Sequence, residues 1–443
     1  MLRRSSIVAA VFLVLAITLT FIQTNNARAA ADDPKGAVRL LATVPVPGTL
    51  QPLRAFDISW LDAATQLYFL ADRSNASVDV VDAKTNQFVT NIQAGFAGVA
   101  FQPNPNGPGM VADNARSGPN GVVVGGRWLF VTDAGSRVVS IDLNANPPVQ
   151  VDEVFTAQGD SLRADELAYD PRDGILLVVN NADDPPFATL IAVDKATGKL
   201  TLGARITFDQ QSTGVDATNG AEQPLWDPGT RKFYLSIPEI NCPGGHNNPP
   251  DKPCGGGYPL GGVVRIDPHS SGAVDALFQV SFCQPAGLTL GPRHDLLLGC
   301  SQAFDTNGQA WSASDKNSAK PISVIMDART GSIDKNVEGV SGNDEVWFNP
   351  GDDRYYLAAR ANPTGPVLGV IDANRQTLVQ LVPTINTAGL PTASPPIPAG
   401  TSHSVAVDPV NNHALVPLPA NNVFPDCLNG CIGVFGIPKG DVD

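Results

Sequence analysis

The sequence has few basic residues and few histidines, and each shortage excludes a class of function. Lys and Arg total 29 against 43 Asp and Glu, and the net charge is −14. Nucleic acid and anionic membrane surfaces repel such an acidic chain, so we expect neither as a partner. Only five histidines are present, and they are scattered along the chain. That number is too small for an iron site built from several histidines.

Several catalytic and cofactor-binding motifs are also missing. The chain contains no GxSxG elbow, no P-loop, no HExxH pair and no CxxCH sequence for haem attachment. Six cysteines are present, but no two have the CxxC spacing that a structural zinc site uses. An even number of cysteines in an exported chain favours disulfides instead.

The first 30 residues have the pattern of an export signal. Arg3 and Arg4 precede an apolar run from Ile7 to Ile22, and a small-residue cleavage pattern follows. The run is short for a membrane span, and no cysteine marks the processing site for a lipid. We therefore expect an exported protein, secreted or periplasmic, with no membrane span once residues 1–30 are removed. Removal takes away three arginines and no acid, which changes the net charge from −14 to −17.

One stretch, residues 119–142, reads as three short strands separated by glycine-containing turns. The strands are expected at residues 121–124, 128–131 and 137–141. Glycine favours these turns because tight hairpins need positive φ angles. Three strands cannot bury both faces of their sheet alone, so such a unit must stack on copies of itself.

The unit recurs, and its first strand is the clearest marker of each copy. Most copies are followed by a fourth strand. The cognates of the first strand are FDISWLDA from Phe56, ADELAYDP from Ala164, AEQPLWDP from Ala221, PAGLTLGP from Pro285, NDEVWFNP from Asn343 and SHSVAVDP from Ser402. Four short strands in seven copies predict an all-β fold, a seven-bladed β-propeller of antiparallel blades forming one domain over residues 31–443.

The seventh copy ends near Lys439, which leaves no chain for its fourth strand. Residues 38–44 form an unpaired strand just before the first copy. We expect this N-terminal strand to complete the last blade, because closure of the ring removes exposed strand edges. The alternatives are a β-sandwich or an open array of hairpins, and seven in-phase copies argue against both.

The positions of the cysteines within the repeat predict how they pair. Cys242 and Cys254 fall in one loop of blade four, and Cys427 and Cys431 fall in the equivalent loop of blade seven. Cys283 precedes a first strand and Cys300 ends the strand that returns beside it. The predicted pairs 242–254, 283–300 and 427–431 are one of 15 possible sets.

The long connections all emerge on the face where the first strands begin. Three join second and third strands, at residues 239–260, 301–320 and 419–430, and two lead into first strands, at residues 102–119 and 384–401. Loops carry function more often than stability, so this face is expected to form a shaped mouth for a small-molecule substrate or an extracellular partner. We expect the protein to be a monomer.

When the first strands are aligned on their last residue, one column of polar residues stands at their beginning. First strands line the central channel of a propeller, so these residues converge on its mouth. The column consists of Asp57, Asn120, Asp165, Glu222, Ala286, Asp344 and His403. Four carboxylates in one narrow channel repel one another unless a cation lies among them.

This ring therefore predicts a divalent-cation site, with Asn120, Asp165, Glu222 and Asp57 as its ligands. Oxygen ligands favour Ca²⁺, and Mg²⁺, Mn²⁺ and Zn²⁺ are left open. Ala286 supplies no ligand. The alternative is a channel filled with water, in which polar residues only satisfy backbone groups.

Residues 119–143 resemble the repeat of the senescence-marker-protein/gluconolactonase family and, more loosely, YVTN-type and NHL-type secreted propellers. In the gluconolactonase-like enzymes a Glu, the Asn of an Asn-Gly pair and an Asp hold a divalent cation that polarises a lactone or ester carbonyl. Asn120 matches the Asn-Gly element, and Asp165 falls at the position of the family's Asp. The chain departs from that family in its seven blades, in a ring Glu that follows the Asn-Gly, and in Glu166, where the family has Gly.

Two functions are compatible with these patterns. The first is a metal-dependent hydrolase, lactonase-like or esterase-like, or a lyase, with His403 or Asp344 as general base. The second is a non-catalytic exported propeller that binds a partner through its elaborated face, with any ion purely structural. Glu166 lies one residue out of register with the ring, so we expect it to point away from the channel axis.

Overall fold

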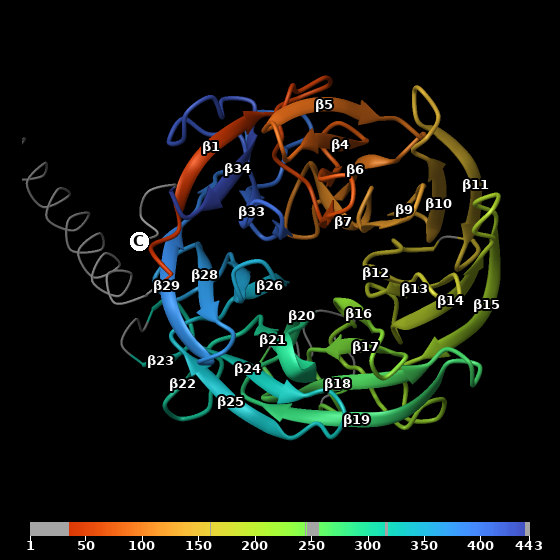
Figure 1. The fold of residues 1–443 in the computed structure, drawn as a ribbon, viewed down its shortest axis with the longest axis vertical. Helices are drawn as coiled ribbons and strands as arrows, with labels where there is room; N and C mark the ends of the chain where they lie inside the picture. The colour runs from red at the N-terminus through yellow and green to blue at the C-terminus, as the bar shows by residue number, and fades with distance from the viewer. Residues whose placement is uncertain (1–34, 160, 244, 246–256, 315–317, 439–443) are drawn as a thin grey trace, which may run out of the picture.

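The computed structural model describes residues 35–438, except for 160, 244, 246–256 and 315–317. The expected export signal and Cys254 lie outside the described residues. Seven four-stranded antiparallel sheets are arranged in a ring about a central axis (Figure 1). The predicted fold class is confirmed: the described residues are almost entirely strands and turns, with one short 3-10 segment at Pro292–His294. Among them, no helix is long and apolar enough to cross a membrane.

Each blade runs from an inner strand beside the channel to an outer strand at the rim. The first four blades are β2 (Ser59–Asp62), β3 (Leu67–Asp72), β4 (Ser77–Asp82) and β5 (Gln87–Ile92); β8 (Val122–Gly125), β9 (Trp128–Asp133), β10 (Arg137–Asp142) and β11 (Val149–Phe155); β12 (Leu167–Asp170), β13 (Ile175–Asn180), β14 (Phe187–Val193) and β15 (Leu200–Thr207); and β16 (Pro224–Asp227), β17 (Lys232–Ile237), β18 (Leu260–Asp267) and β19 (Ala273–Ser281).

The last three blades follow the same order. They are β20 (Pro285–Leu290), β21 (Asp295–Cys300), β24 (Ile322–Asp327) and β25 (Ile333–Glu338); β26 (Asn343–Asn349), β27 (Arg354–Ala359), β28 (Val367–Asp372) and β29 (Thr377–Pro383); and β32 (Ala406–Asp408), β33 (His413–Leu418), β34 (Cys431–Gly436) and β1 (Arg39–Pro45).

The hydrophobic core is divided into separate clusters between neighbouring blades. One cluster joins Leu177 and Val179 of blade three to Phe233 and Leu235 of blade four. All residues of β9 are buried, whereas the outer strand β11 alternates between exposed and half-buried positions. A blade therefore buries its apolar faces only against its neighbours, which is why the unit must recur.

The ring closes as predicted, by pairing of the N-terminal strand with the last blade. β1 runs antiparallel to β34, with a register from Arg39 opposite Gly436 to Pro45 opposite Cys431. The preceding residue, Val38, donates its N–H to Gln380 Oε1 at 2.8 Å and accepts from Gln380 Nε2 at 2.9 Å. These bonds attach the closing strand to blade six as well.

The described disulfides follow the predicted neighbour pairing. Cys283 is bonded to Cys300, and Cys427 is bonded to Cys431. Cys242 also takes part in a disulfide, and its predicted partner Cys254 is not among the described residues. No described cysteine is free.

Three small hairpins elaborate the mouth face. The connection predicted at residues 102–119 belongs to a hairpin of β6 (Gly98–Pro103) and β7 (Met110–Gly118), which lies over the channel in Figure 1. A second pairs β30 (Asn386–Thr387) with β31 (Gly400–Thr401), and a third pairs β22 (Phe304–Asp305) with β23 (Ala319–Lys320). The first two supply part of the wall of the site described next.

Candidate functional site

Five of the seven ring residues line one cavity of about 470 Å³ at the mouth of the channel. They are Asp57, Asp165, Glu222, Asp344 and His403. Side chains from β7 and from the connection before β32 complete the wall. Asn120 is fully buried beside Asp57, and Ala286 is buried outside this cavity. These five side chains therefore lie at the same end of the channel, as their common register predicts.

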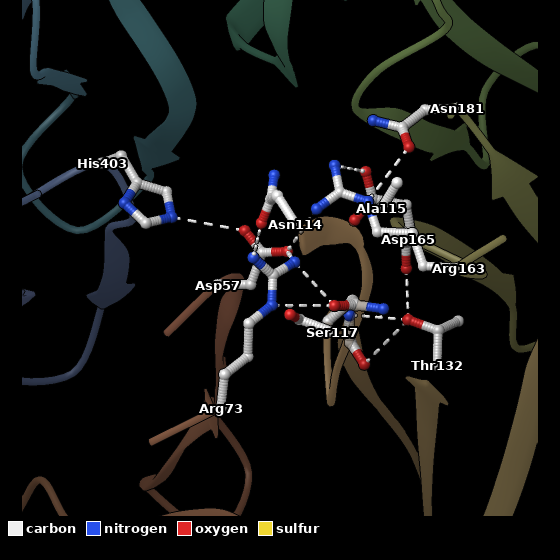
Figure 2. A network of polar contacts seen from close by, with 12 residues as sticks. Asp57, Arg73, Asn114, Ala115, Ser117, Thr132, Arg163, Asp165, Asn181 and His403 are labelled. Carbon is white, nitrogen blue, oxygen red and sulfur yellow. Dashed lines mark hydrogen bonds and ion pairs between the residues drawn. The ribbon is translucent and has the colours of Figure 1, made fainter. Parts of the chain in front are cut away.

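An arginine that the sequence analysis did not consider joins two ring residues. Arg73 follows β3, and its buried guanidinium donates to Asn120 Oδ1 from Nε at 2.9 Å and from Nη2 at 2.6 Å. Its Nη2 also contacts Asp57 Oδ2, and its Nη1 donates to Asn114 Oδ1 on β7 (Figure 2). Asn120 Nδ2 donates to the carbonyl of Ala164 at 2.6 Å, so the amide of Asn120 is fully engaged.

A second buried arginine, Arg163, joins blade three to blade one. Arg163 Nη2 lies 2.9 Å from Asp165 Oδ2, and its Nη1 lies 3.7 Å from Asp57 Oδ2. Its Nε donates to Asn181 Oδ1 at 3.2 Å (Figure 2). At the exposed rim, Arg360 Nη1 lies 3.0 Å from Asp344 Oδ2. Part of the positive charge that the sequence argument assigned to a metal ion is therefore supplied by the protein itself.

A sequence signal for these arginines does exist. Arg73 and Arg360 each follow the second strand of their blade directly, in the cognate segments YFLADR and YYLAAR. A second strand ends beside the beginning of the first strand, so its next residue reaches the mouth. Arg163 comes two residues before Asp165 on the segment that leads into β12. Alignment of the ends of the second strands would have placed Arg73 and Arg360 at the ring.

His403 is held on both sides of its imidazole ring. Nε2 lies 3.3 Å from Asp57 Oδ1, and Nδ1 lies 2.6 Å from Thr401 Oγ1 and 3.0 Å from the Thr401 carbonyl. Phe56 stacks on the ring with centroids 4.9 Å apart. Both ring nitrogens therefore face hydrogen-bond partners, Nδ1 at Thr401 and Nε2 at Asp57. His403 in this arrangement orients Asp57 and has no free nitrogen.

The two sides of the cavity differ in electrostatic balance. Burial raises the pKa of Asp57, but Arg73, His403 and Arg163 outweigh it and hold that pKa well below its ordinary value. Burial raises the pKa of Asp165 to about 7 despite Arg163. Burial, together with repulsion from Asp165 and Asp344, raises the pKa of Glu222 to about 8. Carboxyl groups on the Glu222 side are therefore incompletely neutralised.

The expectation for Glu166 is wrong. Its side chain lines the same cavity as the ring and is only 5% exposed. Val179 accepts from Asp165 N and donates to the Glu166 carbonyl, so two residues stand opposite one, and this bulge interrupts the alternation of side chains. Burial and repulsion from Glu345 raise the pKa of Glu166 well above its ordinary value. Glu166 and Glu222 form no ion pair with any described residue, and the buried Asp165 Oδ1 has no hydrogen-bond partner.

No three of the Asp, Glu and His side chains of the ring, all among the described residues, have ligand atoms close enough together to be a ready-made metal site. The group that does is Asp170, Asp173 and His269, whose ligand atoms lie within 4.8 Å of one another. It belongs to turns on the opposite face of the ring, between blades three and four. His269 Nε2 lies 3.2 Å and Arg231 Nη2 3.4 Å from Asp173 Oδ2, and Asp170 Oδ1 caps its own turn by accepting from Arg172 N. These contacts already account for the group as a structural feature.

Comparison with known proteins supports the fold and leaves the activity open. No family model matches the chain, and no curated protein matches it. Among solved structures it is similar to hydrazine synthase of Kuenenia stuttgartiensis, with a TM-score of 0.58 and 12% identity over 90% of this chain and 98% of that chain. Identity that low shows a shared propeller fold alone. The resemblance of residues 119–143 to the gluconolactonase-like repeat stays a prediction.

Proposed function

We propose that the cavity at the channel mouth binds a divalent cation and that the protein is an exported hydrolase of esters or lactones. One observation supports the cation: among the described residues, Glu166 and Glu222 face the cavity with no ion-pair partner, beside an Asp165 oxygen with no hydrogen-bond partner. Buried carboxylates in this state are costly unless they are protonated or bind a cation. Asp165, Glu222 and Glu166 are the proposed ligands, and Ca²⁺ is favoured because all donors are oxygens.

The oxygens of Asn120 and Asp57, which the sequence analysis included among the ligands, face the Arg73 guanidinium and His403. In the proposal these two residues therefore support the site and do not bind the ion directly. Arg73 and Arg163 hold Asp57 and Asp165 in place across three blades. Positioning by buried ion pairs of this kind fixes the direction in which ligand oxygens point.

A bound cation would polarise the substrate carbonyl as a Lewis acid. The general base in the proposal is Asp344 and not His403. Asp344 is half-buried at the mouth and uses one oxygen, Oδ2, for Arg360, which leaves its other oxygen open to a water molecule. Arg360 is exposed at the same rim and is placed to orient an oxygen-rich substrate.

The test is calorimetric titration of chelator-treated protein with Ca²⁺, Mn²⁺ and Zn²⁺, followed by assays on uncharged esters and lactones. We expect one cation per chain and a melting temperature that rises with the cation, with about 2.7 kcal/mol gained at 100 times Kd. Glu222→Gln should weaken binding by at least about tenfold, because one charged ligand is lost. Glu338→Gln on the exposed outer strand β25 is the matched control and should bind as the wild type does.

Two outcomes would contradict parts of the proposal. If Glu222→Gln binds the cation as well as the wild type does and His269→Ala does not bind it, the metal site is the group of Asp170, Asp173 and His269 on the opposite face of the ring. If a cation binds at the mouth but no ester or lactone is hydrolysed, the protein is a non-catalytic binding propeller. The engagement of both His403 nitrogens is the observation that favours this second candidate.

A further inference from the structure

The far end of the central channel is a second cavity with the opposite chemistry. It has a volume of about 450 Å³, and the inner strands of blades one to six form its walls. The polar and apolar chambers are built from the same strands: Glu222 lines the first and Gln223 the second, and likewise Glu166 and Leu167. Inner strands such as β12, β16, β20 and β26 surround this axis in Figure 1.

Aromatic side chains dominate the wall of this apolar chamber. Three of the five tryptophans of the chain line it, Trp60, Trp226 and Trp347, together with Tyr169 and Phe348. Trp60 of blade one and Trp347 of blade six meet edge to face, with ring centroids 4.9 Å apart. The three tryptophans are only half-buried. Large apolar surface left in contact with water at a concave site marks a place where a ligand binds.

The chamber wall also carries hydrogen-bond donors, and the Gln223 amide is one of them. Gln223 is 8% exposed, and its Oε1 accepts from the backbone N–H of Leu288 at 2.7 Å and of Val346 at 3.4 Å. Its Nε2 has no hydrogen-bond partner among the described residues and belongs to a side chain that lines the cavity. An amide donor that belongs to the cavity wall and has no protein partner favours a ligand that carries an acceptor.

The described residues of the wall include no Asp, Glu, Lys, Arg or His. A charged ligand would lose its hydration there without gaining a counter-charge, so charge is selected against. We propose that this chamber is a binding site for an uncharged, largely apolar small molecule that carries a carbonyl or similar acceptor. Its volume lies within the range of ordinary small-molecule sites, and its walls confine the opening to the axis of the ring. The proposal stands independently of the polar cavity.

The test uses an uncharged fluorescent naphthyl ketone, 6-propionyl-2-dimethylaminonaphthalene, as the probe for the full chain. Saturable one-to-one binding should shift the probe emission to the blue and quench tryptophan emission by energy transfer, because three of the five tryptophans lie at the site. Trp226→Ala should weaken binding about tenfold through lost aromatic contact. Leu290→Glu, at a half-buried wall position, should abolish it by introducing a charge.

The controls separate this site from adsorption elsewhere. Phe155→Ala removes an exposed aromatic from the outer strand β11 and should leave binding unchanged. The parent 2-dimethylaminonaphthalene lacks the ketone and should bind to the wild type more weakly than the probe does. On Gln223→Leu, the parent and the probe should bind equally well. The anionic 8-anilinonaphthalene-1-sulfonate should bind more weakly than both.

Three results would overturn the proposal. One is probe binding that Phe155→Ala weakens and Leu290→Glu does not. Another is binding of the anionic dye as tight as that of the uncharged ketone. The third is a dimer in sedimentation that Leu290→Glu dissociates, because a second copy of the chain would then cover the chamber. Far-ultraviolet circular dichroism of each variant confirms that the propeller is folded before binding is compared.

Discussion

Replacement of Arg73 by Leu should be among the most destabilising single changes at the channel mouth. The guanidinium is buried and contacts Asp57, Asn120 and Asn114, which lie on three different segments. Leu keeps apolar bulk but leaves the Asp57 carboxylate with only His403 at 3.3 Å and Arg163 at 3.7 Å. Removal of one partner of a buried ion pair costs about 3–5 kcal/mol, because the remaining charge stays desolvated.

The pH dependence gives this prediction a specific signature. In the wild type the pKa of Asp57 is well below its ordinary value, so its contribution to stability is present at neutral pH and is lost as the pH falls through that depressed pKa. In Arg73→Leu the burial of Asp57 is no longer outweighed, and its pKa should rise. The stability gap between the two proteins should therefore be largest near pH 7 and should narrow steadily toward pH 3, because Asp57 of the variant, with its raised pKa, becomes neutral over this range.

Urea unfolding followed by tryptophan fluorescence at pH 3, 5 and 7 measures the gap. Arg329→Leu is the matched control: it breaks an exposed pair with Asp327 at 2.8 Å and should cost less than about 1 kcal/mol. The double variant Asp57→Asn/Arg73→Leu should recover part of the loss, because it leaves no unpaired carboxylate. A loss below 1 kcal/mol for Arg73→Leu, or a gap that does not change with pH, would refute this account of the mouth.

Two further predictions concern blade one and the closure of the ring. Burial raises the pKa of Asp72 to about 6, and burial and repulsion from Asp72 raise the pKa of Asp79 well above its ordinary value. Because these pKa values are raised in the folded state, the stability of the protein should fall as the pH rises from about 4 to 6. Asp79→Asn should flatten this fall and stabilise the protein at pH 7 by about 1–3 kcal/mol, measured by urea unfolding. A variant less stable than the wild type at pH 7 would contradict this prediction. Deletion of residues 1–45 removes β1 and exposes the edge of β34, so size-exclusion chromatography should show aggregates of this variant. Deletion of residues 1–34 is the control and should not produce aggregates. If the variant without β1 is monodisperse, closure of the ring is not what keeps the protein from aggregating.

The sequence alone determined the architecture because the deciding signals are local. Strand-length apolar segments, turn glycines and seven in-phase copies predict the blades, and the missing last strand predicts the pairing of β1 with β34. The pairing of Cys283 with Cys300 also follows from one hairpin. The convergence of Asp57, Asp165, Glu222, Asp344 and His403 follows from register, since equivalent positions in a ring face the same axis.

Only the tertiary structure decided what those side chains meet. Whether Arg73 reaches Asp57 and Asn120 depends on the distance between blades one and two, and no spacing within a single repeat encodes that distance. Glu166 faces the cavity beside Asp165, and both residues stand opposite Val179, which is a matter of backbone placement and not of residue type. The apolar chamber likewise depends on a closed ring: Trp60 and Trp347 stand 287 positions apart in the chain and touch only because six blades bring their inner strands to one axis.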